Sequence, residues 1–300
     1  SRSLVTLALS ENFRARGEHL QQFGLKGRLA FIGSLQFETF SFKTYRKFTP
    51  DGLQRQSFFK GETRFQISSN RRFSAGTGWR YEWLKYKPSI QSEFDVTGNN
   101  RIHTGFIYLS SNTLDATVLP GKGLKMEAEA GYVFRQNPNL TFLQNGTPVT
   151  DPDSLGFRYN NYPRFLLKIE WYKPVGSRTT LLMFHQTGLN FNYNQNILNE
   201  FAIGGLTPQF RNQVPFAGLS EALVYTPSVS ALHLGLRFKA SGNLYVTALV
   251  GALHELLDEG AIGEAAALLF EGQRAQLAPD GQAIEGQLRA ERRHRPDAAA

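Results

Sequence analysis

Residues 124–134 constrain the fold of this chain more than any other stretch. Apolar and aromatic side chains occupy every second position there, and charged side chains or glycine occupy the positions between them. Successive side chains of a β-strand point to opposite faces, so the stretch predicts a strand with one apolar and one charged face. Its length matches the roughly 9 to 11 residues that a tilted strand needs to cross a bilayer. The apolar positions are Leu124, Met126, Ala128, Ala130, Tyr132 and Phe134, and the others are Lys125, Glu127, Glu129 and Gly131.

One strand of this kind also fits a sheet that covers a soluble core, so the repetition of the pattern decides between the two. Long and short connections between the predicted strands largely alternate, as in outer-membrane barrels, where long loops lie outside the cell and short turns lie in the periplasm. The sequence therefore predicts an all-β protein, an antiparallel transmembrane β-barrel over residues 1–254. About twelve strands are predicted, at residues 4–13, 20–29, 31–45, 57–67, 73–87, 100–114, 124–134, 164–173, 179–189, 218–225, 229–238 and 244–254.

Local signals between these strands give further predictions. The polar run at residues 14–19 is expected to close the first strand, and Thr-Pro-Asp-Gly at 49–52 is expected to form a turn. The apolar phase changes between Phe37 and Phe40, which predicts a β-bulge. The connections at residues 88–99, 135–163 and 190–217 are expected to be long, and those at 68–72 and 174–177 short.

Composition agrees with a barrel and narrows the alternatives. Aromatic residues make up 13% of the chain, which favours strands. No Cys is present, which excludes a disulfide or a thiolate metal site. The net charge of +8 is scattered instead of forming a stripe with stacked aromatics, so nucleic acid is not expected as a partner. The chain starts without a recognisable signal sequence, so a leader has been removed or a longer protein precedes it.

The last 46 residues, 255–300, differ in composition from the rest. They lack Asn, Lys, Ser, Thr, Tyr, Val and Trp, and Ala and Arg dominate. Residues 256–277 could form an amphipathic helix, and residues 278–300 are expected to be disordered. The abrupt change favours a non-native, frame-shifted tail, with a real C-terminal helix as the alternative.

No catalytic motif occurs in the chain. A Gly-x-Ser-x-Gly elbow, a P-loop and a His-Glu-x-x-His pair are all missing, and the six His residues are dispersed. Glu127 and Glu129 share a strand face, but a charged lumen explains them without acid–base chemistry. We therefore expect no enzyme activity, no metal and no cofactor in this chain.

Two segments resemble one known family. Residues 112–124, with Leu114-Asp115 and then Pro120-Gly-Lys-Gly123, lead into the alternating strand. Residues 199–211 contain Gly204-Gly205 and end at Arg211, and Val214-Pro-Phe-Ala-Gly-Leu follows. Together they resemble the bacterial surface-antigen superfamily of outer-membrane barrels, of BamA, TamA and FhaC type. Over residues 31–254 the resemblance is greatest to the C-terminal barrel of bacterial patatin-like phospholipases.

The resemblance implies a loop at residues 190–217 that folds back into the lumen and carries an inward arginine, Arg211. Asn212 departs from this pattern, because a glycine normally follows that arginine. Gly204 and Gly205 are expected to adopt backbone conformations closed to other residues. Pro120, Gly121 and Gly123 would form a periplasmic turn.

The family barrel has sixteen strands, and the strands predicted here match its third to fourteenth. The resemblance therefore implies that two strands are missing at each end, and that this stretch does not close properly by itself, since a barrel is stable in lipid only with paired edges. Patatin-like relatives carry a hydrolase domain with a Ser-Asp dyad and a small periplasmic domain upstream of the barrel.

Three functions follow as alternatives. The first is a barrel in the outer membrane of a Gram-negative bacterium that anchors or exports an upstream patatin-like phospholipase domain. The second is an assembly or two-partner secretion pore of the same superfamily, and the third is a soluble β-rich binding protein. For a barrel, the expected partners are outer-membrane lipids, the barrel assembly machinery, and upstream periplasmic and hydrolase domains.

Overall fold

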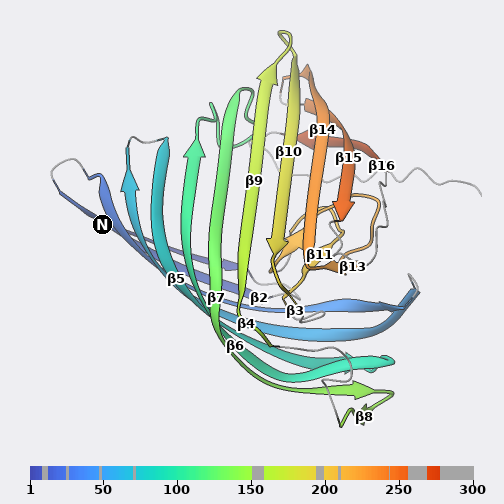
Figure 1. The fold of residues 1–300 in the computed structure, drawn as a ribbon. Coiled ribbons are helices and arrows are strands. Elements are labelled where there is room, and N and C mark those ends of the chain that lie inside the picture. Colours follow the sequence, from blue (N-terminus) through green and yellow to red (C-terminus); the bar gives the residue numbers. More distant parts are fainter. Residues whose placement is uncertain are drawn as a thin grey trace, which may run out of the picture.

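The computed structural model describes residues 1–8, 13–24, 27–46, 49–69, 72–150, 159–193, 199–208, 211–242, 244–255 and 269–277. Its main feature is one strongly curved antiparallel sheet (Figure 1). The strands follow each other in the order β1-β2-β3-β4-β5-β6-β7-β9-β10-β14-β15-β16, with β8 paired to β7. They are β1 (Arg2–Ala8), β2 (Phe13–Phe23), β3 (Leu29–Arg46), β4 (Thr49–Ser68), β5 (Phe73–Ile90), β6 (Phe94–Asn112), β7 (Gly123–Gln144), β8 (Thr147–Pro148), β9 (Tyr162–Pro174), β10 (Thr179–Asn190), β14 (Ser228–Ser241), β15 (Leu244–Glu255) and β16 (Leu269–Leu277).

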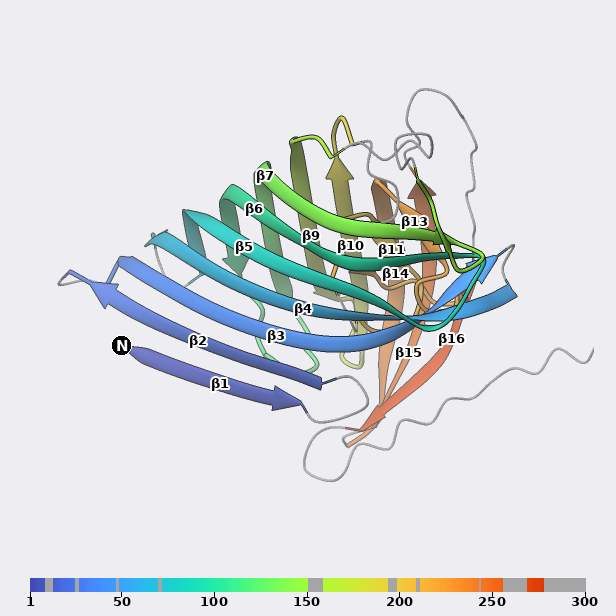
Figure 2. The same cartoon turned by 90° about the horizontal axis from the view of Figure 1, so that it is seen from below.

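The sheet curls into a barrel wall that stays open between its first and last strands. Figure 2 shows β1 and β16 apart at the two ends of the wall, and within the described residues no pairing joins them. We call the concave side of the sheet the lumen. A second sheet of three short strands lies there, in the order β12-β11-β13. Its strands are β11 (Phe201–Ile203), β12 (Gln213–Val214) and β13 (Val224–Thr226).

The two faces of the wall carry different side chains. Glu82 on β5 and Gly188 on β10 contact the small sheet or its flanks, which fixes their face as the lumenal one. Residues that alternate with them point outward, and many are large, apolar and exposed. Phe65, for example, is 63% exposed. Among the residues that the structure describes, no second layer covers this exposed belt, which argues against the soluble β-rich alternative. Its members include Leu35, Phe37, Phe65, Ile67, Trp79, Ile107, Leu109, Tyr132, Phe134, Leu234, Leu236 and Phe238.

Aromatic side chains gather at one edge of this belt. The ring of His103 lies 5.8 Å from that of Trp79, 5.1 Å from that of Tyr81 and 6.0 Å from that of Phe134. Such girdles occur where a barrel meets the lipid headgroups. The alternating residues of the 124–134 stretch therefore form part of an outward apolar face, as predicted.

The prediction that residues 135–163 form one long loop is wrong over its first third. β7 continues to Gln144 and pairs with β6 along its length. The register shifts between His103 and Thr104 of β6, so Phe134 on β7 has no partner opposite it. This bulge exchanges the faces, and Phe142 is consequently buried in the lumen. The apolar alternation stops at Phe134 because its phase changes there, and the strand itself goes on.

The bulge predicted between Phe37 and Phe40 is absent. β3 pairs with β4 without interruption from Leu29 to Thr44, and the register shifts only between Thr44 and Tyr45. Alternation is regular: Phe37 points outward, whereas Phe40 is buried in the lumen. The phase change in the sequence arises because aromatic residues occupy outward positions up to Phe37 and lumenal positions from Phe40, while the strand pairing stays regular.

Several predicted strand boundaries are also wrong. Residues 14–19 belong to β2, because Arg14 and its alternating neighbours face the lumen, where charge is accepted; Arg14 Nε lies 2.6 Å from Glu38 Oε1. Residues 49–52 begin β4 and form no separate turn, and residues 47 and 48 lie outside the described residues. The connection at 88–99 is short, since β5 ends at Ile90 and β6 begins at Phe94. Polar lumenal side chains resemble loop residues in a sequence.

Two predictions near the C-terminus need correction. Residues 218–225 form no barrel strand; only Val224–Thr226 is extended, in the small lumenal sheet. Leu269–Leu277 is a strand that pairs with β15, so an amphipathic helix is wrong there. Pairing satisfies backbone groups of β15 that a helix would leave open. The rest of the 255–300 tail, residues 256–268 and 278–300, lies outside the described residues.

Candidate functional site in the barrel lumen

The candidate site is built around the chain between β10 and β14, which enters the lumen. We call residues 199–208 and 211–227 the lumen segment. Its main contact with the far wall is made by Arg211. The Nε and Nη2 atoms of Arg211 donate to the two carboxylate oxygens of Glu82 on β5, each at 2.9 Å, and Nη1 donates to Asn199 Oδ1 at 3.0 Å. A bidentate pair of this kind fixes both position and orientation.

Arg211 stays charged although it is buried. Burial alone would lower the pKa of its guanidinium, but the carboxylate of Glu82 outweighs burial and raises that pKa above its usual value. The ring of Phe58 lies under the guanidinium, 5.9 Å from its central carbon. Taking two charges out of water is costly, so this pair is better evidence for a fixed geometry of the lumen segment than for stability.

Asn212, which departs from the glycine expected after Arg211, has a backbone geometry that suits glycine or asparagine. Its φ is 59°, in the left-handed region that Asn tolerates better than most residues. Its side chain adds contacts that glycine lacks: Nδ2 donates to the carbonyls of Asn199 and Glu200, and Oδ1 accepts a 2.5 Å hydrogen bond from Arg164 on β9. Asn212 thus links the lumen segment to a second wall strand.

Gly204 and Gly205 lie at the tight bend after β11. Their φ values are 120° and 80°, where other residues are strained. A Cβ atom on Gly204 would lie 1.9 Å from the Ser220 carbonyl oxygen. The bend lets Phe216 bridge back to Gly205, with its N–H donating to the Gly205 carbonyl at 2.9 Å.

The lumen segment is seated on the wall by two aromatic rings that lie over wall glycines. A Cβ atom on Gly188 of β10 would lie 2.3 Å from the ring of Phe201, and one on Gly251 of β15 would lie 3.0 Å from the ring of Phe216. Both rings are buried in an apolar cluster with Val229 of β14. Because Gly188 and Gly251 have no side chain, the rings of Phe201 and Phe216 can pack directly against the wall.

A second charged network crosses the lumenal wall beside the Arg211 pair. Arg80 on β5 donates through both terminal nitrogens to Glu129 on β7, at 2.8 and 2.7 Å, and through Nε to Glu62 on β4 at 2.5 Å. Arg64 also pairs with Glu62. Glu129 is one of the charged residues of the 124–134 stretch. Its pairing with Arg80 shows that the charged face of this stretch points into the lumen.

The turn at residues 113–122, between β6 and β7, contacts the lumenal side of β14 and lines part of the lumen. Asp115 Oδ1 accepts from the backbone N–H of Gly121 at 2.9 Å and of Lys122 at 3.1 Å. Gly123 has a φ of 119°, and a Cβ there would lie 2.4 Å from the Thr113 carbonyl oxygen. Arg237 on β14 reaches across and donates to the carbonyls of Leu119 and Pro120.

Two cavities lie on either side of the lumen segment. One, of about 310 Å³, lies between the lumen segment and the ends of β3 to β6. The other, of about 640 Å³, lies between the lumen segment, the 113–122 turn and β9 to β15. The lumen segment and the turn therefore each occupy part of the lumen.

The structure places the predicted site residues in two groups. Gly204, Gly205 and Arg211 lie in the lumen segment, and Pro120, Gly121 and Gly123 lie in or beside the 113–122 turn. The sequence did not indicate the wall residues that hold these groups: Glu82, Gly188 and Arg237. A charged residue or a glycine facing the lumen is too common in a barrel strand to stand out.

In the described part of the chain, no helix has the length and apolarity to cross a membrane. Nor does that part hold three or more His, Cys, Asp or Glu side chains grouped for a metal ion.

Comparison with known proteins identifies the fold. No protein-family model and no curated protein sequence matches the chain. Among solved structures, BamA from Haemophilus ducreyi lacking POTRA domains 1-3 is similar with a TM-score of 0.60 at 11% identity, over 95% of this chain and 62% of that one. CdiB from Acinetobacter baumannii is similar with a TM-score of 0.50 at 8% identity, over 90% of this chain and 45% of that one. The chain thus spans less than two thirds of either protein.

These similarities define a class. The chain has the antiparallel β-barrel fold of outer-membrane proteins of the BamA and CdiB type. The fold class predicted from the sequence is confirmed, and the predicted location, the outer membrane of a Gram-negative bacterium, is that of these neighbours. The finer resemblance to patatin-like phospholipases is not among these similarities and stays a prediction.

Proposed function

We propose that this chain is the barrel of an outer-membrane protein that assembles or secretes other polypeptides. The observation that carries the proposal is the lumen segment, which Arg211 fastens to Glu82 on the far wall while Phe201 lies on Gly188 of the near wall. The resemblance of residues 199–211 to a loop of patatin-like barrels means that an anchor could carry such a segment too, so the experiment below has to separate the two functions. A barrel that handles polypeptides needs a lumen that is closed at rest, so that the membrane does not leak.

The test uses the full chain in liposomes. An unfolded eight-stranded outer-membrane protein is added, and its folding is followed by its heat-dependent shift on a detergent gel. We expect faster folding than in empty liposomes, and a reduced rate with Arg211→Ala. A secretion role is tested in parallel by attaching a candidate secreted polypeptide and scoring its resistance to protease outside the vesicle. Loss of both effects would remove the proposal.

A second candidate is favoured by one sequence observation. Residues 199–211 and 214–219 resemble the loop of patatin-like phospholipases, so the barrel would anchor or export an upstream hydrolase domain. The partners in that case are outer-membrane lipids, an upstream periplasmic domain, the hydrolase, and the assembly machinery that inserts the barrel. Reading the native coding sequence upstream of residue 1 tests it. A Gly-x-Ser-x-Gly motif there supports the anchor, and periplasmic repeat domains in its place support the first proposal.

A further inference from the structure

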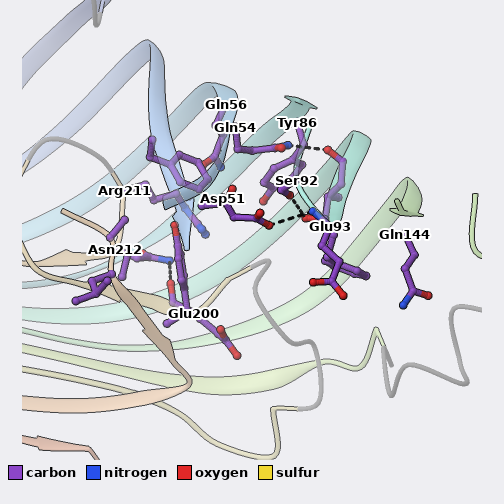
Figure 3. Close-up of a pocket in the computed structure, with 18 residues that line it drawn as sticks. Asp51, Gln54, Gln56, Tyr86, Ser92, Glu93, Gln144, Glu200, Arg211 and Asn212 are labelled. Carbon is purple, nitrogen blue, oxygen red and sulfur yellow. Dashed lines mark hydrogen bonds between the residues drawn. The ribbon is translucent and has the colours of Figure 1, made fainter. Parts of the chain in front are cut away.

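The cavity of about 310 Å³ beside the lumen segment is lined by aromatic and acidic side chains for which the proposed function gives no role. Figure 3 shows it between the ends of strands in the barrel wall and the lumen segment. It is close to the lower limit of small-ligand pockets, which run from roughly 300 to 1,000 Å³. Its described lining residues are Phe42, Thr44, Asp51, Gln54, Gln56, Tyr86, Ser92, Glu93, Phe94, Val96, Gln144, Glu200, Ala202, Arg211, Asn212, Ala222, Leu223 and Tyr225.

Aromatic rings form much of the cavity wall. Phe42 comes from β3, Tyr86 from β5, Phe94 from β6 and Tyr225 from β13 of the lumen segment. The ring centroids of Phe42 and Tyr225 are 6.2 Å apart, so these two rings join the barrel wall to the lumen segment. Rings arriving from four elements can surround one bound group, and the negative faces of such rings attract a cation.

The charged residues of the lining are mostly acidic. Asp51, Glu93 and Glu200 come from separate parts of the chain, and Figure 3 shows their carboxylates around the cavity. The backbone N–H of Glu93 donates to Asp51 Oδ2 at 3.0 Å, which holds the Asp51 carboxylate at the lining. An anionic ligand would be repelled by three carboxylates within one small cavity.

The one cation among the described lining residues does not reverse this balance. Arg211 directs Nε and Nη2 at Glu82, and Nη1 at Asn199, so three of its five N–H donors are used and its charge faces the Glu82 carboxylate. Glu82 also neutralises its charge. The described lining residues therefore combine three carboxylates with aromatic surface.

We infer that this cavity binds a small organic cation: an ammonium or related group attached to an apolar body. The carboxylates attract the charge, the rings of Phe42, Tyr86 and Tyr225 contact it as in aromatic cages, and the apolar body is removed from water. The inference is independent of whether the barrel assembles, secretes or anchors another protein.

Calorimetric titration of the full chain in a neutral detergent tests the inference. The probe is benzyltrimethylammonium, and benzenesulfonate serves as the anionic counterpart. We expect saturable binding of the cation at one site and no binding of the sulfonate. Asp51→Asn should weaken binding by about tenfold, which corresponds to 1.4 kcal/mol, and Asp51→Lys should abolish it. Asp51 is exposed, so neither change is expected to disturb folding.

A matched control separates the cavity from general acidity. Glu127→Gln removes a carboxylate from the lumenal face of β7, away from the cavity lining, and should leave binding unchanged. Retained heat-dependent mobility on a gel shows that each variant is folded. Binding that persists in Asp51→Lys would indicate partitioning into the micelle. That result, equal binding of the sulfonate, or no binding of the cation to the folded chain would each overturn the inference.

Discussion

Arg211 and Glu82 lie 129 positions apart in sequence and form two parallel hydrogen bonds of 2.9 Å across the lumen. Both side chains are almost completely buried. The pair joins the lumen segment, which comes from the chain between β10 and β14, to β5 on the opposite wall. Together with the contact between the rings of Phe42 on β3 and Tyr225, it holds the lumen segment across the lumen.

Removing one member of this pair should be costly. Glu82→Gln leaves the Arg211 guanidinium buried without a countercharge, and we expect a loss of about 3 to 5 kcal/mol in the free energy of unfolding, measured in urea with the chain in lipid vesicles. Replacing both residues, as Glu82→Leu with Arg211→Met, should recover most of the loss. A double variant no better than Glu82→Gln would show that the pair contributes by more than charge compensation. The control is Arg16→Gln, which breaks the exposed Arg16–Glu18 pair and should cost at most about 1 kcal/mol.

The seat of Phe201 on Gly188 predicts a steric effect. Gly188→Val should push the Phe201 ring away from the wall and release the lumen segment, because even a Cβ there would lie 2.3 Å from the ring. We expect faster cleavage at Arg211 by trypsin, followed by mass spectrometry. Phe201→Ala in the same chain should restore resistance. Gly17→Ala on β2 is the control, since a Cβ there meets nothing within 4 Å. Unchanged cleavage in Gly188→Val would mean that the seat does not hold the segment.

The hydrogen bonds of Arg237 to the Leu119 and Pro120 carbonyls predict that the 113–122 turn restricts passage. Arg237→Ala should loosen the turn and raise the frequency of open events in planar bilayer recordings. Arg211→Ala in the same protein should raise the conductance further, because the lumen segment and the 113–122 turn both narrow the path through the lumen. A control, Arg178→Ala, removes an arginine from the short connection between β9 and β10 and should leave the recordings as they are. Identical traces for Arg237→Ala and the unaltered protein would contradict this arrangement.

Asp115 predicts a pH response of the same turn. Burial raises the pKa of Asp115, but backbone N–H groups, those of Lys122 and Gly121 foremost, together outweigh burial and hold that pKa below its usual value. A lowered pKa in the folded state means that the contribution to stability is complete above the unfolded pKa, near 3.9, and is lost as the pH falls through the folded value. The amide signals of Gly121 and Lys122 should therefore move together in an NMR titration below about pH 4. Asp115→Asn should abolish that movement.

The strands could be predicted from the sequence wherever the outward face was apolar without interruption. Residues 124–134 and 229–238 show this alternation, and the structure has strands at both places. Prediction failed where lumenal charge dominated, as at Arg14, or where the phase changed at Phe134. Period two is visible only while one face remains apolar, and a bulge or a polar rim removes that signal without ending the strand.

Less of the candidate site could be predicted. The glycine pair and Arg211 stood out through a family resemblance, but their partners did not. Glu82 looks like any other lumenal carboxylate until the curvature of the sheet brings it opposite Arg211. Gly188 is one glycine among many, and only the position of Phe201 shows what it does. Contacts between the lumen segment and the wall depend on the three-dimensional path of the chain, which no local pattern encodes.

The seat and the cross-lumen pair differ in how far along the chain they reach, and this sets an order of events. Phe201 contacts Gly188, which is only 13 positions away in sequence. The paired strands β10 and β14 and the lumen segment between them can therefore come together early in folding, as one local unit. Glu82 must wait until the sheet has curled. The sheet would thus curl around a lumen segment that is already in place. The segment would not have to be threaded into the lumen afterwards.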